Sequence, residues 1–192
     1  GSVAAIGQKN IKRLLAYSSI SHMGYALAGV ATGTASGYTS TIIYITIYII
    51  MNMGAFACLY LMKTEEKYTE KIEDLSGISK DKPMLAFSFL IIFFSLAGIP
   101  PLGGFFAKFF IFMSVIESEL YALAIIGLLT TVISAFYYLK IIKIIYFDDN
   151  KIKFDDVRNV SLKTTIFLSC LILSLYFISP SIINSLLTGL FI

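Results

Sequence analysis

Charged side chains are scarce in this chain, at 14% of its 192 residues, whereas soluble domains carry about 25%. Hydrophobic residues make up 57% of the sequence, and the mean hydropathy is +0.83. This composition predicts an integral membrane protein and excludes a soluble enzyme or a nucleic-acid-binding protein. The formal net charge of +3 is better explained by loop lysines that face a cytoplasm than by a nucleic-acid partner.

Cysteine is also scarce, and neither cysteine has a neighbour that suggests chemistry. Cys58 and Cys170 each lie inside an apolar run, without a partner at the spacing of metal ligands. We therefore expect both to be inert helix residues and predict no metal site. No secretory signal peptide opens the chain, and the short apolar stretch VAAIG after Ser2 is typical of the tail of an earlier segment. We expect the chain to be a fragment.

Long apolar runs predict an all-α fold of about five membrane-spanning helices, in a single transmembrane domain over residues 1–192. A bilayer core of about 30 Å needs about 20 apolar residues for each helix. We expect spans at about 11–30, 38–62, 84–116, 120–146 and 163–192, separated by polar loops that include 63–83 and 147–162. Pro180 lies inside the last of these spans and is expected to kink it.

Basic residues segregate to one side of this arrangement. Every lysine and arginine except Lys108 lies on or near the amino-terminal segment or the loops 63–83 and 147–162. The opposite side has the acidic turn with Glu117 and Glu119 and no basic residue. Because cytoplasmic loops are enriched in Lys and Arg, we expect these two loops to be cytoplasmic and the carboxy terminus to lie outside.

The third span contains a break that organises the rest of the interpretation. The sequence SLAGIPPLGGFFAKFFIF, residues 95–112, is apolar on both sides of Gly98-Ile99-Pro100-Pro101-Leu102-Gly103-Gly104. Adjacent prolines remove two backbone donors and clash with the preceding turn, so the helix should stop near Gly98 and restart near Gly103. Non-helical backbone at membrane depth must be buried in protein or line a wet cavity, and transporters use such breaks to form ion sites.

Lys108 follows the break by about one helical turn and should lie near the middle of the membrane. Inserting a lysine at that depth costs about 2.5–3.5 kcal/mol, so a charge kept there is a functional candidate by default. Ser95, directly before the break, is a weaker candidate that either touches Lys108 or bonds its own backbone. Tyr137 and Tyr138 stand beside Lys140 and are expected to mark the membrane boundary.

The first span carries a second group of candidates. Lys12, Ser18, Ser19, His22 and Tyr25 fall on one side of a helix, within an arc of about 140°, and rise about 15 Å from Lys12 to His22. His22 is the only histidine in the chain and can exchange a proton near neutral pH, with the hydroxyls holding water. The alternative is that Lys12 is an ordinary anchor at the helix start and that the serines and His22 make interhelical hydrogen bonds.

Two stretches resemble a known family. The sequences QKNIKRLLAYSSISHMGY and DLSGISKDKPMLAFSFLIIFFSLAGIPPLGGFFAKFFIF are similar to the antiporter-like membrane subunits of respiratory complex I, whose relatives include subunits of multi-subunit sodium/proton antiporters. Within the family they are most similar to the N-type subunits. The resemblance implies a fold of two inverted repeats, each with one broken helix, of which this chain holds most of the second.

The resemblance also implies roles for three residues. Lys108 matches the family's lysine on the second broken helix, which is thought to exchange protons with the far side. Lys12 matches a lysine of the central polar axis, and His22 matches a histidine found in several members. The first repeat, with its paired glutamate and lysine, is absent from this sequence, so a complete proton path cannot be built from these residues alone.

The function that the resemblance implies is proton translocation in a bacterial inner membrane, coupled to electron transfer from NADH to quinone. We expect the partners to be other membrane subunits of complex I, lipid and protons, with no nucleic acid. No cofactor is expected in this chain, whereas NADH, FMN, iron–sulfur clusters and quinone are expected in other subunits. Two alternatives stay open: a subunit of a sodium/proton antiporter, and a structural membrane module without transport.

Overall fold

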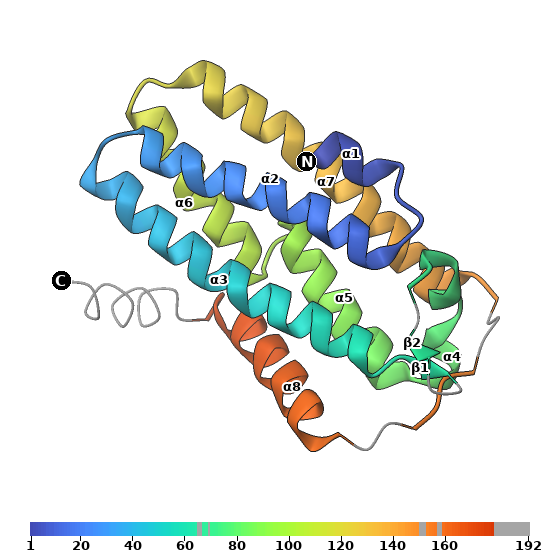
Figure 1. Cartoon of the computed structure of the whole chain (residues 1–192). Coiled ribbons are helices and arrows are strands. Elements are labelled where there is room, and N and C mark those ends of the chain that lie inside the picture. Colours follow the sequence, from blue (N-terminus) through green and yellow to red (C-terminus); the bar gives the residue numbers. More distant parts are fainter. Residues whose placement is uncertain (65–66, 69, 150–152, 157–158, 179–192) are drawn as a thin grey trace.

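A computed structural model describes residues 1–64, 67–68, 70–149, 153–156 and 159–178 of the chain. Within these residues the fold is a bundle of helices (Figure 1). The principal helices are α1 (Ser2–Ile6), α2 (Ile11–Ala31), α3 (Ala35–Tyr60), α5 (Pro83–Ala97), α6 (Gly103–Glu117), α7 (Tyr121–Phe147) and α8 (Val160–Leu175). The all-α prediction and the order of its helices are confirmed. The expected kink at Pro180, and residues 179–192 of the last predicted span, lie outside the described residues.

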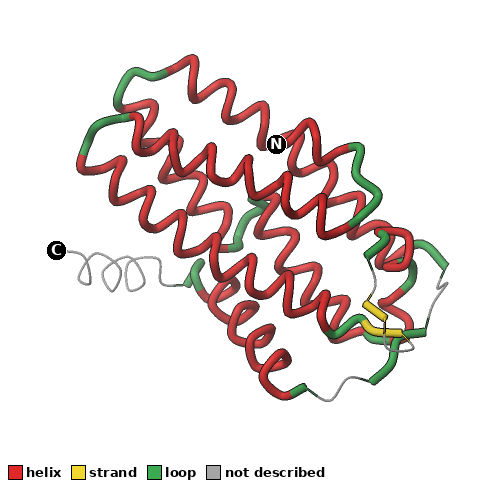
Figure 2. The backbone as a smooth tube through the Cα atoms, viewed as in Figure 1, coloured by secondary structure: helices red, strands yellow, loops and turns green. Residues whose placement is uncertain are grey.

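The segment between α3 and α5 has more structure than the sequence suggested. Two short antiparallel strands, β1 (Lys63–Thr64) and β2 (Lys67–Tyr68), form a small hairpin (Figure 2). They are followed by a 3₁₀ turn, η1 (Ile72–Leu75), and a single turn of helix, α4 (Ile78–Asp81). Neither these elements nor α1 was predicted, because short elements are stabilised by tertiary contacts more than by their own sequence.

Local caps explain where three of the long helices begin. The side chain of Asn10 accepts a hydrogen bond from the backbone N–H of Arg13 at the start of α2. Thr34 caps α3 and Asn159 caps α8 in the same way. Each cap satisfies one of the backbone donors that a helix start leaves unpaired.

Small residues let the helices of the bundle approach one another closely. A side chain at Gly29 of α2 would overlap Thr41 of α3, and one at Gly54 of α3 would lie 2.9 Å from Ile92 of α5. Membrane helices use small residues in this way because dispersion contacts, not the hydrophobic effect, hold them together. Helix α3 therefore packs against α2, α5, α6 and α8.

The charged loops meet at one end of the bundle. The N–H of Ile11 donates to the carbonyl of Glu70 over 2.8 Å, and the N–H of Asp155 donates to the carbonyl of Lys63 over 2.9 Å. Lys82 forms an ion pair of 3.1 Å with Asp156. The turns that join α2 to α3 and α6 to α7 lie at the opposite end (Figure 1). This arrangement agrees with the expected grouping of the two basic loops and the amino-terminal segment.

The outer surface of the bundle is apolar. On α7, Ile125, Leu129 and Val132 have exposed fractions of 59%, 61% and 70%. Among the described helices, α3 and α7 are long and apolar enough to cross a membrane, while α5 and α8 are apolar but shorter. An apolar surface of this extent indicates contact with lipid or with other membrane proteins.

Candidate functional site

The expected break in the third span is present. Helix α5 ends at Ala97, Gly98 adopts a left-handed conformation (φ 85°), and α6 begins at Gly103 (Figure 2). The N–H groups of Gly98 and Ile99 donate to the carbonyls of Ser95 and Phe94 over 3.0 and 2.9 Å. This pattern is a Schellman motif, which closes a helix end with a glycine in the left-handed region.

The Schellman motif leaves the last two carbonyls of α5 for Lys108. The Nζ of Lys108 donates to the carbonyl oxygens of Leu96 and Ala97 over 3.0 and 3.1 Å. Lys108 is 4% exposed, so the amine is held inside the protein against the negative end of the α5 dipole. The buried lysine beside a helix break, which the sequence predicted, is therefore present in the structure.

Gly98 and Gly104 permit the close approach on which this contact depends. A Cβ added to Gly98 would lie 3.1 Å from Cδ and 3.3 Å from Nζ of Lys108, and one added to Gly104 would overlap the carbonyl of Ser95. The Oγ of Ser95 accepts a hydrogen bond of 2.9 Å from the N–H of Gly104. Ser95 therefore joins the two half-helices, a role different from both of those that the sequence suggested.

Tyr25 of α2 lies against the amine of Lys108. Its ring centroid is 5.2 Å from the Nζ of Lys108, a cation–π distance. Its ring also lies edge-on to that of His22, with centroids 6.0 Å apart. The hydroxyl of Tyr25 is held by Thr130 and Thr131 of α7, over 3.1 and 3.2 Å. Tyr25 thus bridges α2, α6 and α7 at the level of the buried amine.

His22 is buried and contacts two tyrosines of α3. Its Nδ1 is 2.7 Å from the hydroxyl of Tyr44 on α3, and its ring stacks on Tyr48 with centroids 4.7 Å apart. Among the described residues, its Nε2 has no hydrogen-bond partner. A buried polar atom without a partner is a natural place for an internal water or a transferable proton. His22 can therefore make the expected interhelical hydrogen bond through Nδ1, while Nε2 stays available for the expected proton exchange.

Hydroxyl groups continue the polar interior on both sides of α2. Ser19 accepts a hydrogen bond of 2.7 Å from Tyr48 on α3. Ser18 lies 2.5 Å from the hydroxyl of Tyr138 and accepts a bond of 3.2 Å from Tyr137 on α7. Tyr137 and Tyr138 are 1% and 0% exposed, so the prediction that they mark the membrane boundary was wrong. They point inward and complete the polar interior.

A pattern in the sequence could have revealed these inward-facing residues of α7. Thr130, Ser134, Tyr137 and Tyr138 recur at intervals of three to four residues in a mostly apolar helix, which places them on one face. The prediction of a membrane boundary was based instead on their proximity to Lys140 in the sequence.

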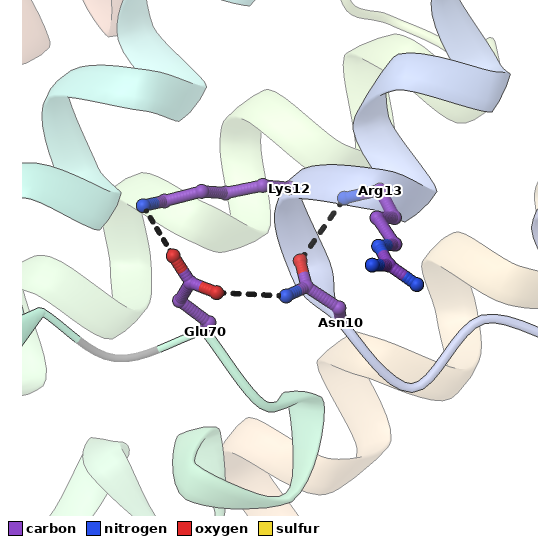
Figure 3. A network of polar contacts seen from close by, with 4 residues as sticks. All are labelled: Asn10, Lys12, Arg13 and Glu70. Carbon is purple, nitrogen blue, oxygen red and sulfur yellow. Dashed lines mark hydrogen bonds and ion pairs between the residues drawn. The ribbon is translucent and has the colours of Figure 1, made fainter.

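Lys12 lies apart from this group, at the charged end of the bundle. Its Nζ is 2.9 Å from Oε1 of Glu70, and its side chain is 37% exposed. Asn10 donates to the other carboxylate oxygen of Glu70 over 3.0 Å (Figure 3). Along α2, Lys12 is about 15 Å from His22. The structure therefore brings Lys108, Tyr25 and His22 together and leaves Lys12 at the rim.

The pKa of the Glu70 carboxyl lies below its ordinary value, chiefly because Lys12 donates a hydrogen bond to it and secondarily because Asn10 does. A lowered carboxyl pKa stabilises the folded state above the ordinary pKa, and this contribution disappears as the pH falls through the lowered value. We expect Glu70→Gln to lower the unfolding temperature of the full-length protein slightly at pH 7, because the pair is exposed. The difference from the unsubstituted protein should vanish once the pH falls below the lowered pKa of Glu70.

The matched control for this prediction is Glu73→Gln, which changes an exposed carboxylate nearby in the same segment. The control should not reproduce the pH-dependent convergence. An equal effect of the two substitutions at every pH would contradict the assignment of the effect to the contact with Lys12.

Comparison with known proteins gives a consistent picture. Residues 1–134 match the family model described as NADH:quinone oxidoreductase/Mrp antiporter, TM. The chain is 59% identical over 181 residues to NADH-quinone oxidoreductase subunit N of Pelagibacter ubique and 45% identical over 183 residues to that of Rhodospirillum rubrum. These matches cover 94% and 95% of the chain but 38% of each relative. The chain therefore spans about 38% of the length of these relatives.

Solved structures share the fold. A chain of respiratory complex I from Thermus thermophilus with bound aureothin superposes with a TM-score of 0.81 at 27% identity, covering 95% of this chain and 41% of that one. A chain of the Mrp complex from Dietzia superposes with a TM-score of 0.83 at 20% identity, covering 97% of this chain and 43% of that one. The second likeness is one of fold alone.

Proposed function

The chain belongs to the NADH:quinone oxidoreductase and Mrp antiporter family of membrane subunits, and we propose that it is part of subunit N of a bacterial NADH:quinone oxidoreductase. Its role there is to carry protons through the membrane arm, with Lys108 as the group that binds and releases them. The single observation that carries this proposal is the hydrogen bonding of the buried Lys108 amine to two free carbonyls at the end of α5.

The contacts of Lys108 suit a group that changes its protonation state. A charged ammonium has three N–H donors, and a neutral amine has two. The carbonyls of Leu96 and Ala97 satisfy both donors of the neutral form and leave the third N–H of the charged form for transfer. Both forms can therefore occupy the same position without a change in the backbone. The helix dipole and the ring of Tyr25 favour the charged form, whereas burial favours the neutral one.

In this mechanism a change of charge elsewhere along the polar interior tips Lys108 between its two forms. When a positive charge arrives nearby, repulsion drives the third proton of Lys108 outward. When that charge leaves, Lys108 takes up a proton again. His22 is the proposed neighbour in this exchange. Two observations support this: its Nε2 has no hydrogen-bond partner among the described residues, and its ring lies edge-on to that of Tyr25, which also contacts Lys108. Lys12 is the proposed entry at the charged end, while Ser18 and Ser19 hold water between Lys12 and His22.

The proposed arrangement in the membrane has five spans: α2, α3, the broken pair α5–α6, α7, and a last span that begins with α8. The break from Gly98 through Pro100, Pro101 and Gly103 to Gly104 then lies inside the membrane. The loops 63–83 and 147–162 face the cytoplasm, in keeping with their content of lysine and arginine. The acidic turn with Glu117 and Glu119 faces outward.

The proposed partners are the other membrane subunits of complex I and the lipid of a bacterial inner membrane. Quinone reduction in other subunits supplies the energy, and NADH, FMN, iron–sulfur clusters and quinone are assigned to those subunits. The relatives named above support this proposal over a sodium/proton antiporter, since both are called NADH-quinone oxidoreductase subunit N.

The experiment that tests this function isolates the parent complex through a tag on the full-length protein and reconstitutes it in vesicles. We expect NADH to be oxidised by quinone with proton translocation in sodium-free buffer. A complex without NADH oxidation that exchanges sodium for protons would establish the antiporter alternative instead. Electron transfer without any proton movement would favour a structural role.

A further inference from the structure

A groove of about 600 Å³ runs between α5 and α8 on the outside of the bundle. Its floor is made of buried side chains, Leu61, Leu85 and Ile166, which are 9%, 9% and 6% exposed. Its walls are exposed apolar side chains, including Phe87 and Phe167 at 52% and 64%. The groove is therefore apolar, and it opens to the surface that is expected to face lipid.

The polarity of the groove changes along its length. Lys82, Asp156 and Lys163 line it at the charged end of the bundle, while apolar residues of α5 and α8 line it as far as Ile91 and Ser174. From Lys82 to Ile91 the α5 wall extends about 14 Å, and from Lys163 to Ser174 the α8 wall extends about 17 Å. The groove thus has a cationic mouth and an apolar interior that extends across about half of a bilayer core.

The mouth of the groove is positive for two reasons. Both helices begin there, with Lys82 directly before α5 and Lys163 in the first turns of α8, so the positive ends of both helix dipoles point toward it. The Lys82 side chain is only 19% exposed, whereas its ion-pair partner Asp156 is 97% exposed. The ammonium of Lys82 is thus the more enclosed member of the pair, and the carboxylate of Asp156 is the more solvent-exposed one.

We propose that this groove binds one acyl chain of an anionic phospholipid, with the lipid phosphate between Lys82 and Lys163. The two parts of the lipid match the two parts of the groove: the anionic headgroup matches the cationic mouth, and the acyl chain matches the apolar interior. Basic pockets between transmembrane helices on the cytoplasmic side bind anionic headgroups in this way. A polypeptide segment in the same place would have to supply acidic residues at the mouth and apolar ones along the floor, whereas a phospholipid carries both.

Cys170 provides a reporter inside the groove. It lines the channel and is partly exposed, while Cys58 is fully buried elsewhere in the bundle. A maleimide added to the delipidated parent complex should therefore alkylate Cys170 and spare Cys58, as measured by peptide mass mapping. Added phosphatidylglycerol should slow the alkylation of Cys170 at lower concentration than phosphatidylcholine does.

Charge substitutions test the headgroup contact. Each lysine near a membrane surface contributes about 1 kcal/mol to the binding of anionic lipid, which corresponds to a factor of about five. Lys163→Gln should therefore raise the phosphatidylglycerol concentration needed for protection about fivefold and leave phosphatidylcholine unaffected. Lys80→Gln, an exposed lysine paired with Asp149 outside the groove, is the matched control and should change neither value.

Asp156→Asn keeps the proposal testable if Lys163→Gln does not assemble. Removing the carboxylate at the edge of the mouth should strengthen protection by phosphatidylglycerol. Equal protection by the two lipids in the unsubstituted complex would overturn the proposal. So would a Cys170 that stays unreactive after delipidation, because the groove would then be covered by polypeptide, and so would weaker protection in Asp156→Asn.

Discussion

Replacing Lys108 with alanine in the parent complex is expected to lower proton pumping at least about tenfold, together with the electron transfer coupled to it, while the complex still assembles. A positioned proton-transfer group contributes about 10²–10⁴-fold to a rate. Among the lysines and arginines of the described helices, Lys108 is the one whose side chain is buried. The measurement is acidification of vesicles per NADH oxidised, with the amount of assembled complex determined in parallel.

Assembly should survive because two effects on stability oppose each other. Removing the amine leaves the carbonyls of Leu96 and Ala97 without their donor, which costs about 1–3 kcal/mol for each buried group. The substitution also removes the need to bury a charge, which costs several kcal/mol for an ion without a full set of partners. The remaining difference should be small beside the packing of the whole bundle.

Two further variants separate proton transfer from a static contact. Lys108→Arg keeps a positive charge and N–H donors but cannot release a proton, because a guanidinium stays protonated in proteins. We expect this variant to assemble and not to pump. Lys140→Ala makes the same chemical change as Lys108→Ala at an exposed position of α7 and should pump normally. Normal pumping in Lys108→Arg would remove Lys108 from the mechanism and leave it a structural role.

The features of the site that could be predicted from the sequence are those that depend on neighbouring residues. The break follows from the prolines at 100 and 101 and the glycines around them, because proline cannot continue a helix and glycine can adopt the left-handed conformation that ends one. The burial of Lys108 follows from the apolar run around it. Local rules of this kind need no knowledge of which helices lie side by side.

The partners of these residues could not be predicted in the same way, because they come from distant segments. Tyr138 reaches Ser18 across 120 positions of sequence, and Lys12 meets Glu70 across 58. A tyrosine pair beside a lysine has the sequence pattern of a membrane boundary. Only the packing of α7 in the bundle shows that these two side chains face the protein interior. Likewise, the pairing of Lys12 depends on the fold of the segment 63–83, where short strands and turns follow from tertiary contacts.

The largest structural effect is expected from Gly104→Ala. A methyl group at this position would overlap the backbone carbonyl of Ser95 in the other half-helix. Overpacking costs about 1–3 kcal/mol and occasionally more, and the upper end applies here because a backbone carbonyl cannot turn away as a side chain can. The half-helices must then separate, which breaks the bond between Gly104 and Ser95 and moves Lys108 away from the end of α5.

Two other glycines provide matched controls for this substitution. A Cβ at Gly103 would make ordinary contacts with Leu173 and Tyr176, the nearest at 3.4 Å, and one at Gly24 of α2 would meet nothing within 4 Å. Gly103→Ala should be nearly neutral, and Gly24→Ala should stabilise slightly, by about 0.5–1 kcal/mol, because alanine is the better helix former. Thermal unfolding of the purified complex measures all three variants.

The pumping assay then links the geometry of the break to its chemistry. Gly104→Ala leaves every proton-binding side chain in place, so a loss of pumping in the assembled fraction of this variant would arise from the displaced contact between Lys108 and the α5 carbonyls. If Gly104→Ala has the same unfolding temperature and the same rate of proton pumping as Gly24→Ala, the close crossing of the half-helices does not control the position of Lys108. The proton-transfer role would then have to depend on the amine alone, without the carbonyl pair that accepts its hydrogen bonds.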